Sequence, residues 1–171
     1  MALRFEELIE QHHDEIFAYL WRLLGSGGRR DGAMDVEDLA QEVFMRAYQG
    51  FADLRPNSNH RAWLYKIATN CAYTRLKQMK HRRDKLSSLQ DATTEPGATS
   101  GTSISRKNME KKMRALVNSL PAKQKACVTL RYLQELDYPE IAQILGCSQD
   151  SARANVYQAI RRLRLRLEES R

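Results

Sequence analysis

The residues best suited to chemistry in this sequence are basic and aromatic side chains that recur between residues 61 and 85. They fall three or four positions apart, which places them along one stripe of a helix. The stripe contains Trp63, Lys66, Asn70, Tyr73, Lys77 and Lys80. Ammonium groups hold phosphates and aromatic rings stack on unpaired bases, so the stripe favours binding of single-stranded DNA. Two alternatives stay open: Trp63 and Tyr73 only pack on a neighbouring helix, or the charges are simply solvated.

A second group of polar side chains lies near the C-terminus, on the face of a predicted helix opposite its apolar residues. The outward residues are Ser151, Ala154, Asn155, Gln158, Arg161 and Arg162. The amides of Asn155 and Gln158 have the geometry that suits adenine in the major groove, and arginines, Arg153 included, suit guanine or phosphates. This face therefore predicts contact with double-stranded DNA.

The elements that position this second group read as a helix-turn-helix. Leu120-Pro121 opens a helix that runs to about Leu133, because proline is tolerated in a first turn. Asp137 and Glu140 then form a capping box for a short helix that ends at Leu145. Gly146 permits the left-handed backbone of a helix end, and Ser148 caps the final helix, which continues through Leu167. A purely structural helical hairpin is the alternative.

Three helices are expected in the first half of the chain. Apolar residues recur at helical spacing from Phe5 to Leu23, and glycines at 25–28 break this helix. A second helix is expected after Asp35 as its cap, with an apolar face and a polar face. The apolar face contains Val36, Leu39, Ala40, Val43, Phe44, Ala47 and Tyr48, and the polar face contains Glu37, Asp38, Gln41, Glu42 and Arg46. A polar loop at 53–60 precedes a third helix, which runs to about residue 86.

Charge and composition divide the chain into parts. Residues 1–54 carry 5 Lys and Arg against 11 Asp and Glu, whereas residues 55–86 carry 9 against 1 and residues 106–171 carry 14 against 7. Two basic segments imply two contacts with nucleic acid, and the acidic segment implies a different partner. Residues 87–106 are rich in Ser, Thr, Gly and Ala, so they are expected to be a flexible linker. The chain is thus predicted to be all-α, with small helical domains at 1–86 and 107–171.

Several other classes of protein are disfavoured. The N-terminus has no charged-then-apolar leader and no apolar stretch is long enough to span a membrane, which predicts a soluble cytoplasmic protein. No paired carboxylates, Ser-His pairing or phosphate-cradling glycine loop indicates an enzyme. Adjacent His12 and His13 point to different helix faces, so we expect neither a metal nor another cofactor. Cys71, Cys127 and Cys147 are expected to be buried free thiols.

Three stretches, taken together, resemble the extracytoplasmic-function sigma factors of bacterial RNA polymerase. Residues 35–44 (DVEDLAQEVF) are similar to the polymerase-binding helix of that family, and residues 61–70 (RAWLYKIATN) to its promoter-melting helix. Residues 120–146, including YPEIAQILG, look like the domain that reads the upstream promoter element. The resemblance covers nearly the whole chain.

The resemblance implies partners and site residues. Glu37, Asp38, Gln41 and Glu42 would dock on the clamp helices of the β′ subunit of core polymerase, whose β flap would be a second contact. The −10 element would be captured by a flipped base and held open. The residues implied in −10 binding are Arg55, Asn57, Ser58, Asn59, His60, Arg61, Trp63, Lys66, Asn70, Tyr73 and Lys77.

The C-terminal helix would read the −35 element. The residues implied are Ser148, Ser151, Arg153, Ala154, Asn155, Gln158, Arg161 and Arg162. Asn155 and Gln158 stand where the family often has basic residues, so its usual base contacts do not transfer directly. The linker would thread the RNA exit path of polymerase, and an anti-sigma factor is an expected partner. The competing interpretation is a stand-alone helix-turn-helix regulator.

Overall fold

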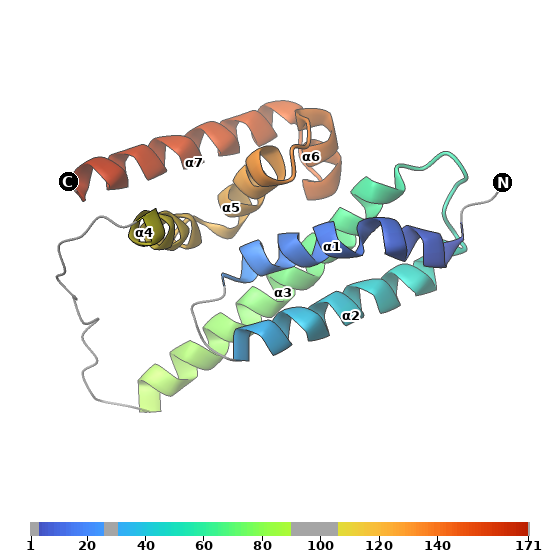
Figure 1. The fold of residues 1–171 in the computed structure, drawn as a ribbon, viewed down its shortest axis with the longest axis horizontal. Coiled ribbons are helices and arrows are strands. Elements are labelled where there is room, and N and C mark those ends of the chain that lie inside the picture. Colours follow the sequence, from blue (N-terminus) through green and yellow to red (C-terminus); the bar gives the residue numbers. More distant parts are fainter. Residues whose placement is uncertain (1–3, 26–30, 90–105, 171) are drawn as a thin grey trace.

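The computed structural model of the chain describes residues 4–25, 31–89 and 106–170. Every regular element in these residues is a helix, which confirms the all-α prediction (Figure 1). In chain order the helices are α1 (Phe5–Leu24), α2 (Asp31–Phe51), α3 (His60–Leu89), α4 (Arg106–Asn118), α5 (Ala122–Val128), the π-helical turn η1 (Thr129–Leu133), α6 (Tyr138–Leu145) and α7 (Gln149–Glu169). None of the described helices is long and apolar enough to cross a membrane.

The first domain is a bundle of α1, α2 and α3, in which each helix packs on the other two. The predicted apolar faces meet in its core, where Leu20, Val43 and Leu64 are fully buried. Gly25 ends α1 with φ of 61°, the left-handed backbone that glycine adopts without strain. The rest of the predicted break, residues 26–30, lies outside the described residues.

The predicted start of the second helix is wrong. Asp35 does not cap α2, which begins at Asp31, and the Asp35 carboxylate instead lies 3.5 Å from Nη1 of Arg75 on α3. An aspartate marks a helix start only where the preceding residues cannot continue the helix. Ala33 and Met34 are good helix formers, so the helix extends one turn further back.

The helix-turn-helix of the second domain is confirmed in detail. The Asp137 carboxylate accepts a hydrogen bond from the Glu140 amide at 2.9 Å, and the Glu140 carboxylate accepts one from the Asp137 amide at 3.4 Å. Gly146 has φ of 62°, and Ser148 Oγ accepts a hydrogen bond from the Ser151 amide at 3.1 Å. The caps read from the sequence therefore fix both ends of the turn between α6 and α7.

Two segments differ from the expected pattern. The helix after Pro121 does reach Leu133, but its last turn is the π-helical η1, closed by the Gln134 amide donating to the carbonyl of Thr129 at 3.0 Å. Helix α3 continues to Leu89, three residues past its expected end, and Arg106 begins α4. Residues 90–105, which hold the remainder of the predicted linker, lie outside the described residues.

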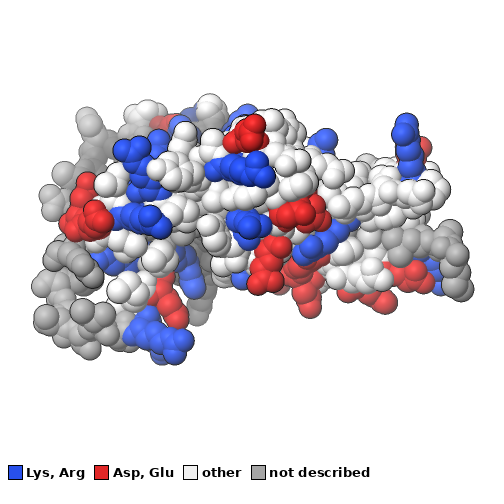
Figure 2. Space-filling model, turned by 90° about the horizontal axis from the view of Figure 1, so that it is seen from above, with Lys and Arg blue, Asp and Glu red and all other residues white. Residues whose placement is uncertain are grey.

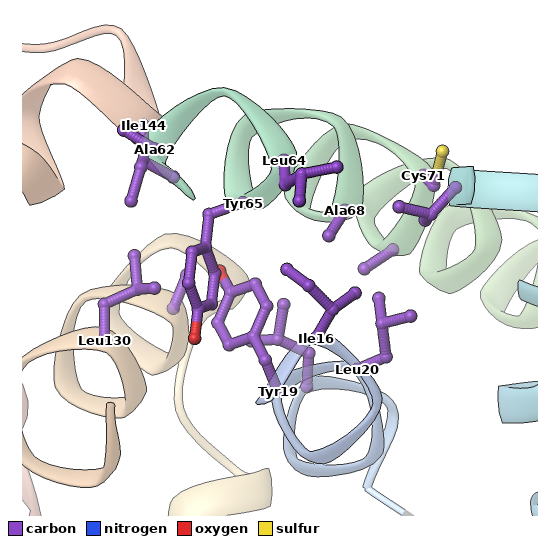
Figure 3. Close-up of a cluster of buried hydrophobic side chains, with 14 of the residues drawn as sticks. Ile16, Tyr19, Leu20, Ala62, Leu64, Tyr65, Ala68, Cys71, Leu130 and Ile144 are labelled. Carbon is purple, nitrogen blue, oxygen red and sulfur yellow. The ribbon is translucent and has the colours of Figure 1, made fainter. Parts of the chain in front are cut away.

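The two helical domains pack against each other. Helix α6 lies along α3, and η1 and α5 contact α1. Figure 3 shows Ala62 of α3 beside Ile144 of α6, and Tyr65 of α3 and Tyr19 of α1 beside Leu130 of η1. One cluster of buried side chains therefore extends across both domains, and a second, smaller cluster of Leu120, Val128, Ala159 and Leu163 lies within the second domain.

Candidate partner and nucleic-acid interfaces

The acidic face predicted on α2 is present at the surface. Glu37, Asp38 and Gln41 are exposed, and Glu42 is half-buried. Glu42 accepts a hydrogen bond from Arg46 at 2.7 Å, so part of its charge is neutralised within the helix. Glu37 and Asp38 form no ion pair with any described residue, which leaves their charges available to a partner.

An apolar groove runs between α1 and α2 beside this acidic face. It has a volume of about 1030 Å³, and its walls include Phe5, Phe44, Met45 and Tyr48, with Glu37 and Gln41 among the lining residues. The side chains of Met45 and Tyr48 are 65% and 68% exposed. Met45 was not among the predicted site residues, and the prediction that Tyr48 lies on the buried face is wrong. Tyr48 instead packs edge-on against Phe5, with ring centroids 5.2 Å apart.

The polar loop before α3 is ordered by its own hydrogen bonds. The Ser58 amide donates to the carbonyl of Arg55 at 3.0 Å, and the Asn59 side-chain oxygen accepts from the Ala62 amide at 3.0 Å, which caps α3. Arg55, Asn57 and Asn59 are exposed, whereas Ser58 and His60 are half-buried. The amide nitrogen of Asn59 also lies 3.5 Å from the Glu140 carboxylate of α6, so the loop touches the second domain.

The polar and the aromatic residues of the predicted stripe on α3 differ in their exposure. Lys66, Asn70 and Lys77 are exposed. Trp63 is half-buried and lies against Gly50, where a Cβ atom would sit 3.3 Å from its Cζ2. Tyr73 faces the second domain: burial, together with the neighbouring thiols of the second domain, raises the pKa of its hydroxyl, which has no hydrogen-bond partner among the described residues. The packing alternative therefore holds for both rings.

Arg61 belongs to a polar network rather than to the free surface. Its guanidinium donates to the Glu15 carboxylate at 2.7 and 3.0 Å and lies over the ring of Tyr65. Burial opposes ionisation of Glu15, but hydrogen bonds from Arg61 and His12 outweigh it, so the pKa of Glu15 is below its ordinary value. The network was missed because its members lie on different helices, and no spacing along the chain reports such a contact.

Tyr65 connects this network to the second domain. Its hydroxyl lies 3.0 Å from Glu15 Oε2 and 2.9 Å from the side-chain oxygen of Gln134, yet a hydroxyl has only one hydrogen to donate. The Gln134 amide nitrogen is buried without a partner. Turning the Gln134 amide satisfies both groups: its nitrogen donates to Tyr65, and Tyr65 donates to Glu15.

The outward face of α7 is shifted from the predicted one. Arg153, Ala154, Tyr157, Gln158 and Arg161 are exposed, and they repeat at intervals of four residues. Tyr157 is 71% exposed and was not among the predicted residues, although it lies one turn after Arg153 and one turn before Arg161. Figure 2 views this side of the molecule and shows Lys and Arg gathered over the part that α7 forms.

Other residues predicted to read bases are engaged within the protein. Ser151 and Asn155 are half-buried, and the Asn155 amide donates to the carbonyl of Ser151 at 2.8 Å. The Gln158 side-chain oxygen accepts from Gln124 at 3.1 Å. Ser148 uses its hydroxyl as a helix cap, and Arg162 is exposed at the edge of the face.

Comparisons with known proteins agree with this architecture. Residues 8–83 match the model for Sigma-70 region 2, and residues 110–163 match the model for Sigma-70, region 4. The RNA polymerase sigma factor YlaC of Bacillus subtilis (strain 168) is 30% identical over 172 residues, spanning 97% of this chain and 93% of that protein. The ECF RNA polymerase sigma-E factor of Escherichia coli (strain K12) is 29% identical, spanning 91% of this chain and 82% of that protein.

Two solved structures share the fold. The sigma factor RpoE in complex with the anti-sigma factor NepR from Bartonella quintana superposes with a TM-score of 0.70 at 20% identity, covering 98% of each chain. CnrH in complex with the cytosolic domain of CnrY gives a TM-score of 0.67 at 19% identity, covering 98% of this chain and 89% of CnrH. The paired region 2 and region 4 matches define a sigma factor of the Sigma-70 type. The chain belongs to the extracytoplasmic-function (ECF) sigma factors of RNA polymerase.

Proposed function

We propose that this protein binds core RNA polymerase through α2 and directs it to promoters by two separate DNA contacts, one on α3 and one on α7. The observation that carries the proposal is that the negatively and positively charged surfaces of the described residues lie on different helices. Among these residues, Glu37 borders an apolar groove on α2 and forms no ion pair, and cations that form no ion pair lie on two other helices, Lys66 and Lys77 on α3 and Arg161 and Arg162 on α7. Residues 1–86 would bind polymerase and the −10 element, residues 107–171 the −35 element, and residues 87–106 would link them.

Polymerase docking would use both charge and apolar contact. Glu37 and Asp38 offer free negative charge, and Glu37 and Gln41 line the groove. A basic partner helix, such as the β′ clamp helices, would pair with the carboxylates while its apolar side chains cover Met45 and Tyr48. Glu42 would contribute less, since Arg46 already binds its carboxylate. The β flap would contact the second domain.

The −10 contact would be made by the exposed members of the predicted set. Arg55 and Asn57 of the loop, with the half-buried Ser58 beside them, would hold a flipped base. Lys66, Asn70 and Lys77 would follow the phosphates of the melted strand. The remaining members would position this surface from within the protein: Asn59 caps α3, Arg61 is held by Glu15, and His60, Trp63 and Tyr73 pack. The protein would hold DNA open without making or breaking a covalent bond.

The −35 contact would be made by the outward stripe of α7. Tyr157 would lie at its centre and offer a ring to thymine methyl groups, with Arg153 and Arg161 directed to guanine or phosphates. Ala154 would permit close approach, and Gln158 would read adenine after releasing Gln124. Ser148, Ser151 and Asn155 would hold the helix start in place, and Arg162 would contact the backbone of the DNA.

An anti-sigma factor is a further proposed partner. One of the similar solved structures is a sigma factor in complex with an anti-sigma factor, and the other is CnrH in complex with the cytosolic domain of CnrY. The apolar groove of α1 and α2 would suit such a partner, and occupation of the groove would exclude polymerase from the same face.

Reconstitution with bacterial core polymerase tests the function. Transcripts made from genomic DNA with and without this protein would be sequenced at their 5′ ends. We expect initiation at a defined set of promoters only when the protein is present, and weak promoter binding by the protein alone. Tight, sequence-specific binding without polymerase would contradict the proposal and favour a stand-alone regulator.

A further inference from the structure

We propose that the second domain carries a nucleotide site, a cavity beside α7 that takes one free nucleoside triphosphate. The base lies against exposed tyrosine rings and the phosphates against two arginines. Because the cavity shares part of its wall with the outward stripe of α7, a bound nucleotide excludes the −35 element. This consequence rests on the proposed function. Binding of the nucleotide itself is a property of the free chain and can be tested without polymerase.

The cavity lies between η1, the start of α6 and the part of α7 from Arg153 to Glu168. Its volume is about 500 Å³, which is within the range of about 300–1,000 Å³ typical of small-molecule sites. The lining includes the buried Val156, the half-buried Ile160 and the exposed Leu165. These side chains form an apolar surface against which a flat ring can lie.

Exposed tyrosine rings give the cavity a surface for an unpaired base. Tyr132 and Tyr157 both line the cavity and are 57% and 71% exposed. The third ring, Tyr138, is already covered, because the guanidinium carbons of Arg131 and Arg153 lie 4.7 and 5.2 Å from its centroid. Stacking hides the faces of the bases in a duplex, so rings that are free to stack select an unpaired base. The duplex −35 element offers no such face to Tyr132.

Two arginines provide the cavity with an anion site. Arg161 and Arg164 are exposed, line the cavity and lie three positions apart, which makes them neighbours on one face of α7. Neither forms an ion pair or a hydrogen bond with another described residue, whereas Arg153 lies 3.4 Å from the carboxylate of Asp150. Guanidinium groups bind phosphate oxygens in pairs, so two free arginines suit a ligand with several phosphates.

The last turn of the cavity favours a single nucleotide over a continuing strand. Glu168 lies one turn after Arg164 and lines the same cavity. Its carboxylate repels any further phosphate along α7. Arg164, Leu165 and Glu168 also lie beyond Arg161 and Arg162, where the proposed −35 contact ends, so the DNA contact does not account for this part of the cavity.

The nucleotide and the −35 element compete for the same side chains. A nucleotide in the cavity covers Tyr157 and engages Arg161, and both belong to the outward stripe of α7. By linkage, the affinity of the second domain for the −35 element falls once the nucleotide concentration exceeds its dissociation constant. The cavity thereby makes the −35 contact sensitive to free nucleotide.

Isothermal titration calorimetry of the full chain with ATP, in EDTA and about 0.1 M salt, tests the site. We expect one site with a dissociation constant below about 1 mM. Tyr132→Ala should weaken binding about five- to a hundredfold because a stacking ring is lost, and Arg164→Ala should weaken it at least about tenfold. Glu168→Gln should tighten binding, because it removes the repelling carboxylate. The matched controls Leu133→Ala and Arg114→Ala, at exposed positions outside the cavity, should bind like wild type.

Four outcomes would overturn the site. One is the absence of saturable binding up to about 5 mM ATP. Inorganic triphosphate that binds as tightly as ATP would reduce the site to an anion patch, and a single-stranded hexanucleotide that binds more tightly than ATP would assign it to a strand. Unchanged binding in Tyr132→Ala and Arg164→Ala would place the ATP elsewhere on the protein.

Promoter binding by the reconstituted holoenzyme tests the competition. Saturating ATP should weaken binding to a promoter with a −35 element at least about threefold, and by no more than deletion of that element does. The Tyr132→Ala holoenzyme should not respond in this way. ATP at the substrate site of polymerase affects both holoenzymes equally, so an equal response of the two would overturn the competition. If no holoenzyme forms, the proposed function fails, while calorimetry on the free chain still tests the site.

Discussion

Replacement of Lys125 by methionine should remove a specific part of the pH dependence of stability. Lys125 is 5% exposed, and burial lowers the pKa of its ammonium group from 10.5 to about 8. In the unfolded chain the pKa returns to its ordinary value. Between pH 8 and 10.5 the unfolded state therefore binds more protons than the folded state, and the contribution of this group to the free energy of unfolding rises with pH.

The size of the effect follows from the difference between the two pKa values. One pKa unit corresponds to about 1.4 kcal/mol, so the full change across this window is about 3 kcal/mol. At pH 7 the variant loses the penalty of a buried charge but leaves the Leu23 carbonyl without its donor, which costs about 1–3 kcal/mol. These two terms nearly cancel, so the variant should match wild type at pH 7 and fall below it by about 3 kcal/mol at pH 10.5.

Urea unfolding followed by circular dichroism between pH 7 and 10.5 measures this difference. Cys127 titrates in the same range with the opposite sign: burial raises the pKa of its thiol from 9 to about 11, so its contribution to stability falls over that range. Subtracting the variant curve from the wild-type curve removes this term. The matched control is Lys123→Met, two residues away and exposed, which should parallel wild type. A pH-independent difference between wild type and Lys125→Met would refute the reasoning.

The remaining predictions concern the other surfaces. Tyr157→Ala should reduce initiation at promoters that depend on the upstream element by about tenfold in reconstituted transcription, with no loss of polymerase binding. Asp38→Lys should weaken binding to core polymerase at least tenfold at low salt, as measured by fluorescence anisotropy, and Glu110→Lys on α4 should not. Tyr65→Phe should lower the free energy of unfolding by about 1.5–3 kcal/mol because it removes a bond to a charged carboxylate, whereas Tyr73→Phe should leave it unchanged or raised. Equal effects of the two phenylalanine substitutions would contradict the assigned hydrogen bonds.

Local signals in the sequence predicted the second domain well. The capping box of Asp137 and Glu140, the left-handed Gly146 and the Ser148 cap depend only on residues a few positions apart, and all three are present. The same kind of signal failed at Asp35, because a capping residue is informative only when the preceding residues break the helix. Local rules thus predicted where most helices end and which faces are apolar.

Local rules could not predict that, on the stripe of α3, the lysines are exposed while the aromatic rings are packed within the protein. Lys66 and Tyr73 lie on the same stripe by spacing alone, and an aromatic ring on a helix is equally suited to stack on a base or on a protein. Whether the ring is exposed or packed depends on whether another helix lies against it. Here the second domain reaches Tyr73 and α2 reaches Trp63, so only the lysines and Asn70 stay free.

The packing of the two domains was hidden for a related reason. Lys125 of α5 would be read from the sequence as a solvent-facing residue, yet it is buried and donates to the carbonyl of Leu23 in the first domain. Thr129 of η1 is buried as well, and its hydroxyl has no hydrogen-bond partner among the described residues. Burying polar groups costs free energy, so local rules place such residues at the surface. Their burial depends on the neighbouring domain, which no spacing along the chain reports.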